Sequence, residues 1–161
     1  MKKIGVISDN HGYMNPKVYG LFAGVDEILH AGDIGNLDII TSLEAIAPVR
    51  AVYGNIDTFP IVGRYPEVLA VELGGIRICM LHEFRGLTDP KLEAAFASLP
   101  GESADIVICG HSHQAKLEKI SGIYIFNPGA AGRKRFSLRP AVGMIHVQEN
   151  GQFTPEIIYL E

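Results

Sequence analysis

Three short apolar segments near the start of the chain are each followed by a polar loop and then, in two cases, by a helical pattern. The segments cover residues 4–8, 25–30 and 48–53. Runs of this length are typical of buried strands, and their alternation with helices is typical of parallel α/β units. Since parallel strands end at the same edge of a sheet, the residues that follow the three segments are predicted to lie close together.

The rest of the chain changes to antiparallel patterns. Two alternating runs flank Gly74-Gly75 and predict a hairpin. A region with two prolines and a glycine, residues 58–66, is expected to form an irregular loop. No repeat or linker interrupts the chain, so one domain over residues 1–161 is expected. Helices are predicted over 15–24, 37–46 and 90–99, and strands over 68–73, 76–81, 104–108, 116–120, 123–126, 142–148 and 153–160.

Composition narrows the setting in which the protein works. The 161 residues carry a formal net charge of −4, which gives no general attraction to nucleic acid or anionic lipid. Cys79 and Cys109 lie in apolar runs, which favours reduced buried thiols over a disulfide. The first apolar run ends at Asp9 and is too short for a signal peptide or a membrane span. We therefore expect a cytoplasmic protein with no membrane partner and no stable nucleic-acid binding.

Side chains of the metal-ligand type follow five of the predicted strands. Asp33 and Asn55 each follow a glycine, and each taken alone would be interpreted as a turn residue. The motif Gly110-His111-Ser112-His113 is more specific, because a glycine permits the turn that brings two imidazoles together. It is the order of all the motifs that indicates a site. The complete set is Asp9, His11, Asp33, Asn55, His82, His111 and His113.

The chemistry of this set suits catalytic transition metals. Carboxylates, imidazoles and an amide without a thiolate favour manganese, iron, nickel, cobalt or zinc over a structural cysteine site for zinc. Seven ligands are more than one catalytic ion can use while it keeps a position open for water. Two ions that share a bridging carboxylate are therefore predicted.

The motifs together resemble the five sequence blocks of the calcineurin-like metallophosphoesterase superfamily. The short length, Gly-Asn-Ile-Asp at residues 54–57 and Asn-Pro-Gly at residues 127–129 are similar to its small single-domain phosphodiesterase branch. The resemblance implies an α/β (α+β) fold, a four-layer αββα sandwich of two mixed β-sheets flanked by helices. The blocks are Asp9-Asn10-His11, Gly32-Asp33, Gly54-Asn55, His82 and Gly110-His111-Ser112-His113.

The resemblance also implies a role for each candidate ligand. One ion would take Asp9, His11 and His113, the other would take Asn55, His82 and His111, and Asp33 would bridge the two. Manganese is the favoured ion, with nickel, iron, cobalt and zinc as alternatives. Asp33, Asn55 and His111 are expected to act in catalysis as well. Many relatives have histidine where this chain has Ile56 and Phe84, so the resemblance does not identify a general acid.

The activity implied is hydrolysis of small phosphodiesters at a dinuclear metal centre through a bridging hydroxide. Two divalent ions, two carboxylates and one hydroxide sum to about +1, which a singly charged diester neutralises. A phosphomonoesterase or nucleotidase is the alternative, and its dianionic substrate would need further cations. A solvated loop is the favoured interpretation of the basic candidates. They are Arg133, Lys134, Arg135 and Arg139, with Arg64 and Arg85 elsewhere.

Two alternatives concern partners. The small branch also includes a non-catalytic subunit of the retromer coat, so a protein-binding scaffold of the same fold is a weaker hypothesis. It is weaker because that subunit lacks some of the blocks that this chain keeps. The apolar edges of the antiparallel strands could also pair between two copies of the chain, which leaves a homo-oligomer open.

Three further residues of the ligand type have both a functional and a structural interpretation. His30 either orients Asp33 or packs as an ordinary strand residue. Asp57 either bonds a ligand histidine or caps a turn, and the turn is favoured. His146 lies in the middle of a predicted strand and is expected to be structural.

Overall fold

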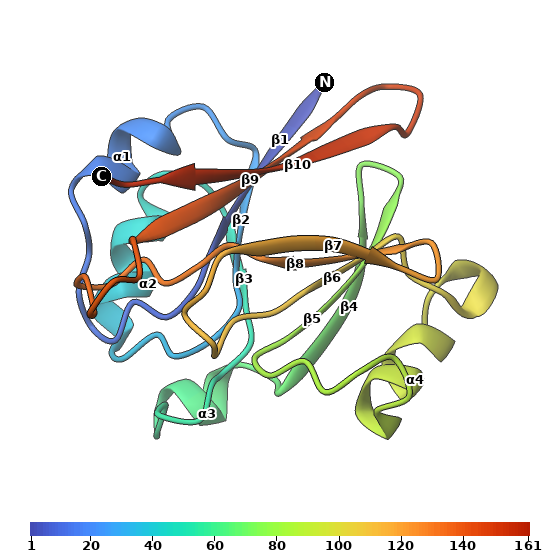
Figure 1. Ribbon diagram of the computed structural model, residues 1–161, viewed down its shortest axis with the longest axis horizontal. Helices are drawn as coiled ribbons and strands as arrows, with labels where there is room; N and C mark the ends of the chain where they lie inside the picture. Colours follow the sequence, from blue (N-terminus) through green and yellow to red (C-terminus); the bar gives the residue numbers. More distant parts are fainter.

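The computed structural model describes residues 1–161 and contains two mixed five-stranded sheets (Figure 1). In the first sheet the order is β10-β9-β1-β2-β3, and in the second it is β4-β5-β6-β8-β7. The first sheet comprises β1 (Lys2–Ile7), β2 (Glu27–His30), β3 (Val49–Ala51), β9 (Ala141–Val147) and β10 (Phe153–Tyr159). The second comprises β4 (Val68–Leu73), β5 (Ile76–Leu81), β6 (Ile106–Ile108), β7 (Lys116–Ile120) and β8 (Ile123–Asn127).

Alternating side chains of the strands build separate apolar layers. Ile4 and Val6 of β1 pack with Ile78 of β5 in a core between the two sheets. Ile7 and Ile28 point to the other face of the first sheet, where a second core lies. Such alternation follows from the two-residue period of a strand.

Helices cover the outer faces of both sheets. The first sheet is covered by α1 (Lys17–Leu21) and α2 (Leu37–Glu44), and the second by α4 (Pro90–Ala97) with the short 3₁₀ helix η1 (Pro100–Glu102). A third core, which includes Leu92 of α4, lies under this second layer. The predicted four-layer αββα sandwich is therefore confirmed. None of the helices combines the length and apolar character needed to cross a membrane.

Most expected elements end within two residues of their observed bounds, and two differ by more. The first helix was expected to reach Gly24 but ends at Leu21, because Phe22 leaves the helix to pack against Gly5 of β1. The segment expected to be an irregular loop contains the one-turn helix α3 (Ile61–Arg64). Buried Ile61 anchors this turn to the core over the first sheet, a tertiary contact that the local prolines do not reveal.

The strand directions bring distant loops to one edge. β1, β2 and β3 run parallel, and so do β5, β6 and β8 in the other sheet. Bonds between the loops tie the two edges together. The backbone N–H of Ala131, after β8, donates to the Ser8 carbonyl (2.9 Å) and joins the two sheets, while that of Asp9 donates to the Gly32 carbonyl (3.0 Å) and joins the loops after β1 and β2 within the first sheet. The ends of both sets of strands therefore form one connected surface.

An ion pair remote from this edge gives a prediction of stability. Asp105 accepts hydrogen bonds from the Arg77 backbone N–H (2.8 Å) and from its guanidinium (2.8 and 3.2 Å). These bonds lower the pKa of the Asp105 carboxyl below its ordinary value of 3.8. Because the pair is partly exposed, Asp105→Asn should lower the free energy of unfolding by about 1 kcal/mol at pH 7.

The same pair fixes the expected pH dependence. A carboxyl whose pKa is depressed by folding contributes stability above its unfolded pKa and loses it as the pH falls through the folded pKa. The difference between wild type and Asp105→Asn should therefore shrink below about pH 4. Urea unfolding at pH 7, 5 and 3 measures it, with Glu149→Gln, an exposed carboxylate outside any helix, as control. A difference that stays constant to pH 3 would contradict the assignment.

Candidate metal centre

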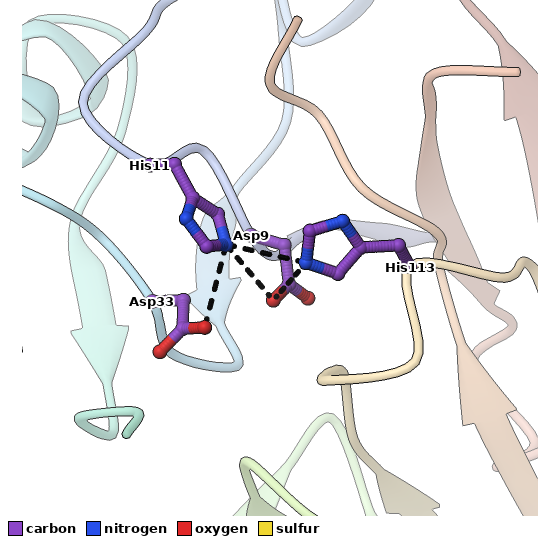
Figure 2. A group of neighbouring side chains, drawn as sticks. All are labelled: Asp9, His11, Asp33 and His113. Atoms are coloured by element: carbon purple, nitrogen blue, oxygen red, sulfur yellow. Dashed lines mark hydrogen bonds and ion pairs between the residues drawn. The ribbon is translucent and has the colours of Figure 1, made fainter. Parts of the chain in front are cut away.

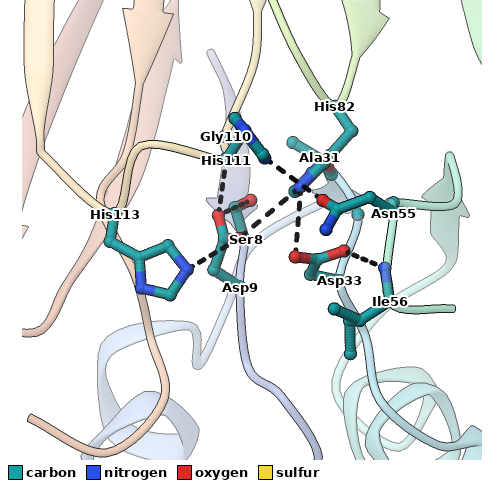
Figure 3. Close-up of polar contacts among 12 residues, drawn as sticks. Ser8, Asp9, Ala31, Asp33, Asn55, Ile56, His82, Gly110, His111 and His113 are labelled. Atoms are coloured by element: carbon teal, nitrogen blue, oxygen red, sulfur yellow. Dashed lines mark hydrogen bonds and ion pairs between the residues drawn. The ribbon is translucent and has the colours of Figure 1, made fainter. Parts of the chain in front are cut away.

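All seven predicted site residues lie on the loops that follow the parallel strands β1, β2, β3, β5 and β6, and five of them have a left-handed backbone. The φ angles are 55° at Asp9, 48° at His11, 55° at Asp33, 75° at His111 and 62° at His113. Residues other than glycine reach this region only at a cost of order 1–3 kcal/mol each. In return, the chain reverses directly after the strand and each side chain faces the space between the two sheet edges (Figures 2 and 3).

Asp9 is buried and presents one oxygen to the other site residues. Its Oδ2 accepts hydrogen bonds from Ser8 Oγ (2.6 Å) and from the His111 backbone N–H (3.1 Å). Its Oδ1 is buried without a hydrogen-bond partner and lies 3.3 Å from His113 Nε2. Burial raises the pKa of the Asp9 carboxyl. His113, Ser8 and the charge of His82 together lower it by a larger amount, so the net pKa lies below its ordinary value.

His82 is oriented in the same way. Its Nδ1 donates to the Ala31 carbonyl (2.8 Å), and its Nε2 is buried without a hydrogen-bond partner. This Nε2 lies 3.2 Å from Asp33 Oδ2 (Figure 3). Burial lowers the pKa of His82, but Asp33 and Asp9 raise it above its ordinary value. The surroundings of Nε2 therefore favour positive charge at this point.

Asp33 lies between two groups of side chains. Its Oδ1 accepts from the Ile56 backbone N–H (3.0 Å). Its Oδ2 is 3.2 Å from His82 Nε2 and 3.4 Å from His11 Nε2, on opposite sides of the site. Burial raises the pKa of the Asp33 carboxyl, while the nearby His82 imidazole and the hydrogen bond from Ile56 lower it to a net value below the ordinary one.

The first group of side chains contains Asp9, His11 and His113 with Asp33. One ligand atom from each of these four lies within 4.8 Å of the others, close enough for a single cation to reach all of them. The Nε2 atoms of His11 and His113 face each other at 3.2 Å (Figure 2).

The second group contains Asn55, His82 and His111. Asn55 Oδ1 is 3.1 Å from His111 Nδ1, and the rings of His82 and His111 meet edge to face with centroids 5.3 Å apart. The structure thus brings together all the residues that the sequence singled out, in two groups that meet at Asp33.

One buried carboxylate oxygen and one buried ring nitrogen, both without a hydrogen-bond partner, test whether a metal suits this arrangement. Asp9 Oδ1 and His82 Nε2 are the buried side-chain atoms of the protein that lack a hydrogen bond, and they lie 3.8 Å apart. Unpaired buried polar atoms are costly and call for an explanation. Because His82 Nδ1 carries the proton that Ala31 accepts, neutral His82 turns a lone pair toward two carboxylates. Cations bound in this space would satisfy these lone pairs, so the donor set fits a metal.

Asp57 and His30 hold the loops but do not touch the candidate ligands as side chains. Asp57 accepts the backbone N–H groups of Gly54 (2.8 Å), Gly35 (3.0 Å) and Ile34 (3.2 Å), which confirms the turn interpretation. His30 does not bond the Asp33 carboxylate. Instead its Nε2 donates to Asn10 Oδ1 (2.8 Å), and its Nδ1 accepts the Gly32 N–H (3.1 Å). Complete burial lowers its pKa to about 4, so it works as a neutral strut.

Several supporting residues were not predicted from the sequence. Ser8 bonds Asp9, and Asn127 Nδ2 donates to the Gly110 carbonyl (3.0 Å) and to Ser112 Oγ (3.1 Å), which fixes the loop that carries both histidines. A Cβ on Gly110 would collide with Ser8 Oγ, so this glycine permits the close approach of the two loops. Asn127 was marked only by its place in an Asn-Pro-Gly motif.

The left-handed backbone of His113 generates a prediction. At φ 62° an alanine carries a steric cost that a glycine does not. Metal-free His113→Gly should therefore have a higher free energy of unfolding than His113→Ala, by about 1 kcal/mol. The greater flexibility of glycine in the unfolded chain reduces this difference in part. Chemical denaturation of both variants in the presence of a chelator measures the difference. The same pair at His82, which has no positive φ, is the control and should show the opposite order.

His146 pairs with Glu156 on the neighbouring strand at 2.9 Å, far from these loops, in agreement with a structural role.

Comparisons with known proteins agree with this geometry. The sequence model of the calcineurin-like phosphoesterase superfamily domain matches residues 1–150. A probable metallophosphoesterase of Methanothermobacter thermautotrophicus is 34% identical over 134 residues, covering 79% of this chain and 76% of the relative. A phosphodiesterase of Methanocaldococcus jannaschii is 27% identical, with 79% and 82% covered. The solved structure of Chaetomium thermophilum Vps29 matches with a TM-score of 0.75 at 21% identity, covering 99% of this chain and 97% of the other. The chain belongs to the calcineurin-like phosphoesterase superfamily.

Proposed function

We propose that this protein is a metal-dependent phosphodiesterase that acts as a single domain over residues 1–161 and hydrolyses small phosphodiesters. The observation that supports the proposal most is the pair of buried, unpartnered atoms, Asp9 Oδ1 and His82 Nε2, which lie 3.8 Å apart, with His82 Nε2 also 3.2 Å from Asp33 Oδ2. The family match and the phosphodiesterase among the relatives support the same reaction class.

Two divalent cations, manganese by preference, would be held by the seven residues. Asp9, His11 and His113 would hold one, Asn55, His82 and His111 the other, and Asp33 both. When bound, such cations lower the pKa of a water molecule and offset negative charge on phosphoryl oxygens. The remaining work is done by the protein, which must place these ligand atoms before substrate arrives.

Hydrogen bonds from outside the site fix the ligand atoms in place. Ser8 and the His111 N–H use one oxygen of Asp9 and leave the other free, while the Ala31 carbonyl fixes the His82 tautomer that leaves Nε2 unprotonated. The Ile56 N–H does the same for one oxygen of Asp33. Such outer partners orient ligands and tune their basicity. The site is therefore assembled in advance of binding.

Local charge favours a diester over a monoester at the Asn55 side of the site. Arg85 is paired with Glu83 (2.7 Å), and Arg64 lies 3.7 Å from Glu44, so neither adds a free positive charge. Arg85 also lowers the pKa of the Glu83 carboxyl, which keeps it ionised 3.3 Å from His111 Nε2 and unsuited to donate a proton. With Ile56 and Phe84 in place of histidines, substrates with good leaving groups suit the site best.

The proposed activity can be tested directly. With added Mn²⁺ the protein should hydrolyse bis-p-nitrophenyl phosphate, and Asp33→Asn or His82→Ala should lower kcat/KM by at least about 100-fold, because each removes a ligand atom. Release of p-nitrophenol measures the rate. Asp38→Asn, which changes an exposed carboxylate on α2, should leave it unchanged. Absence of turnover with every divalent metal, although ions bind, would favour the scaffold hypothesis instead.

The proposed metal stoichiometry can be tested by removing and restoring the metal. Calorimetric titration of the chelator-treated protein with Mn²⁺ should give two ions per chain. When the concentration of free Mn²⁺ is 100 times the Kd of a site, binding at that site should raise the free energy of unfolding by about 2.7 kcal/mol. Asp33→Asn should weaken both sites, whereas His113→Ala should weaken one. A single site in the wild type, or equal effects of both substitutions, would refute the assignment of Asp33 as the shared ligand.

A further inference from the structure

A cavity adjoins the candidate metal centre on the side of His11 and His113. It has a volume of about 210 Å³, and Asp9, His11 and His113 form its inner wall. Its outer wall is formed by Tyr13 and by Arg133 and Arg135 of the segment that follows β8. Sites for drug-sized ligands occupy about 300–1,000 Å³, so this space suits one small group.

The structure separates the four basic residues of that segment into two pairs. Lys134 Nζ pairs with Glu161 Oε1 (3.0 Å), and Arg139 Nη2 donates to the Glu161 carbonyl (2.7 Å) and stacks on Tyr159 at 3.9 Å. These two residues hold the C-terminus. Arg133 and Arg135 line the cavity, and neither forms an ion pair with a carboxylate. All four residues are exposed, in agreement with a solvated loop, but only Arg133 and Arg135 also line the cavity.

One contact orients the Arg133 guanidinium, and another fixes the backbone at Arg135. The Arg133 guanidinium carbon lies 4.2 Å from the centre of the Tyr13 ring, a cation–π contact that orients the group and leaves its N–H donors free. The Leu138 N–H donates to the Arg135 carbonyl (3.0 Å) and closes a tight turn that holds Arg135 at its base. The Arg133 side chain and the Arg135 backbone are thus held beside the cavity by contacts that are not part of the metal centre.

Charge then indicates what the cavity binds. With two cations in place, the centre carries about +1 and is balanced by the singly charged phosphodiester that is hydrolysed. Arg133 and Arg135 add two positive charges that this group does not balance. Guanidinium forks match the paired oxygens of a phosphate, and a charged group of this size fits the volume.

We infer that Arg133 and Arg135 form an anion subsite that binds a second phosphate group of the substrate. The inference rests on the proposed function. The substrate class is then a phosphodiester that carries a terminal phosphate in addition to the phosphoryl group that is cleaved. The subsite lies on the side of His11 and His113, so this terminal phosphate belongs to the part of the substrate that extends away from Asn55 and His111.

Two matched substrates test the inference by kinetics. Thymidine 5′-(p-nitrophenyl phosphate) and its 3′-phosphorylated form differ only in a terminal phosphate, and both release p-nitrophenol. The wild type should prefer the 3′-phosphorylated form, and the double variant Arg133→Gln/Arg135→Gln should reduce the ratio of the two kcat/KM values at least about tenfold. Lys134→Gln removes a charge from the same segment and should leave the ratio unchanged. An unchanged ratio in the double variant, or an equal loss on both substrates, would overturn the inference.

A binding measurement separates failure of the subsite from failure of the enzymatic proposal. Chelator-treated protein should bind inorganic pyrophosphate, and the double variant should weaken this binding about tenfold in calorimetry, while Lys134→Gln should not. If the wild type hydrolyses neither thymidine ester but shows this pattern, the subsite stands and the phosphodiesterase proposal fails. Equal pyrophosphate affinity in wild type and double variant would refute the subsite whatever the activity.

Discussion

Two buried carboxylates, Asp9 and Asp33, set the requirement that the rest of the site meets. Charge removed from water is costly unless opposite charge or hydrogen bonds compensate it. Backbone N–H groups and Ser8 satisfy one oxygen of each carboxylate, and imidazoles surround the other. The arrangement leaves lone pairs that converge on the same small space. A divalent cation is the simplest partner for such a set, and the bonds to Ala31 and Ile56 make sense as devices that keep the lone pairs aimed inward.

The topology explains how residues more than a hundred positions apart reach that space. Parallel strands of two facing sheets all end at one edge, and the left-handed residues turn the chain there within a single position. Asp57 then ties the loop after β2 to the loop after β3, while Asn127 ties the loop after β6 to the end of β8. Each loop is thus fixed by hydrogen bonds to a neighbouring loop, and the site does not depend on any single segment.

Local signals in the sequence were sufficient for much of this architecture. The hairpin of β4 and β5 agrees with its predicted bounds because Gly74 and Gly75 both adopt positive φ, which few other residues do. The candidate ligands were identifiable because they combine ligand chemistry with a place at a strand end. Features that depend on distant partners were not: His30 bonds Asn10 rather than Asp33, and Ile61 anchors α3 through the core. Arg133 could be distinguished from Lys134 only once the position of Glu161 was known.

The three apolar cores contain none of the seven candidate ligands. Burial of aliphatic side chains between and outside the sheets provides the main driving force for folding, whereas the polar loops at the sheet edge add backbone strain. The residues that stabilise the fold are thus different from the candidate metal ligands. Substitutions of the ligand residues could therefore abolish activity while the apolar cores and the fold remain. A shared fold among proteins of this architecture is a poor guide to whether a given protein is an enzyme.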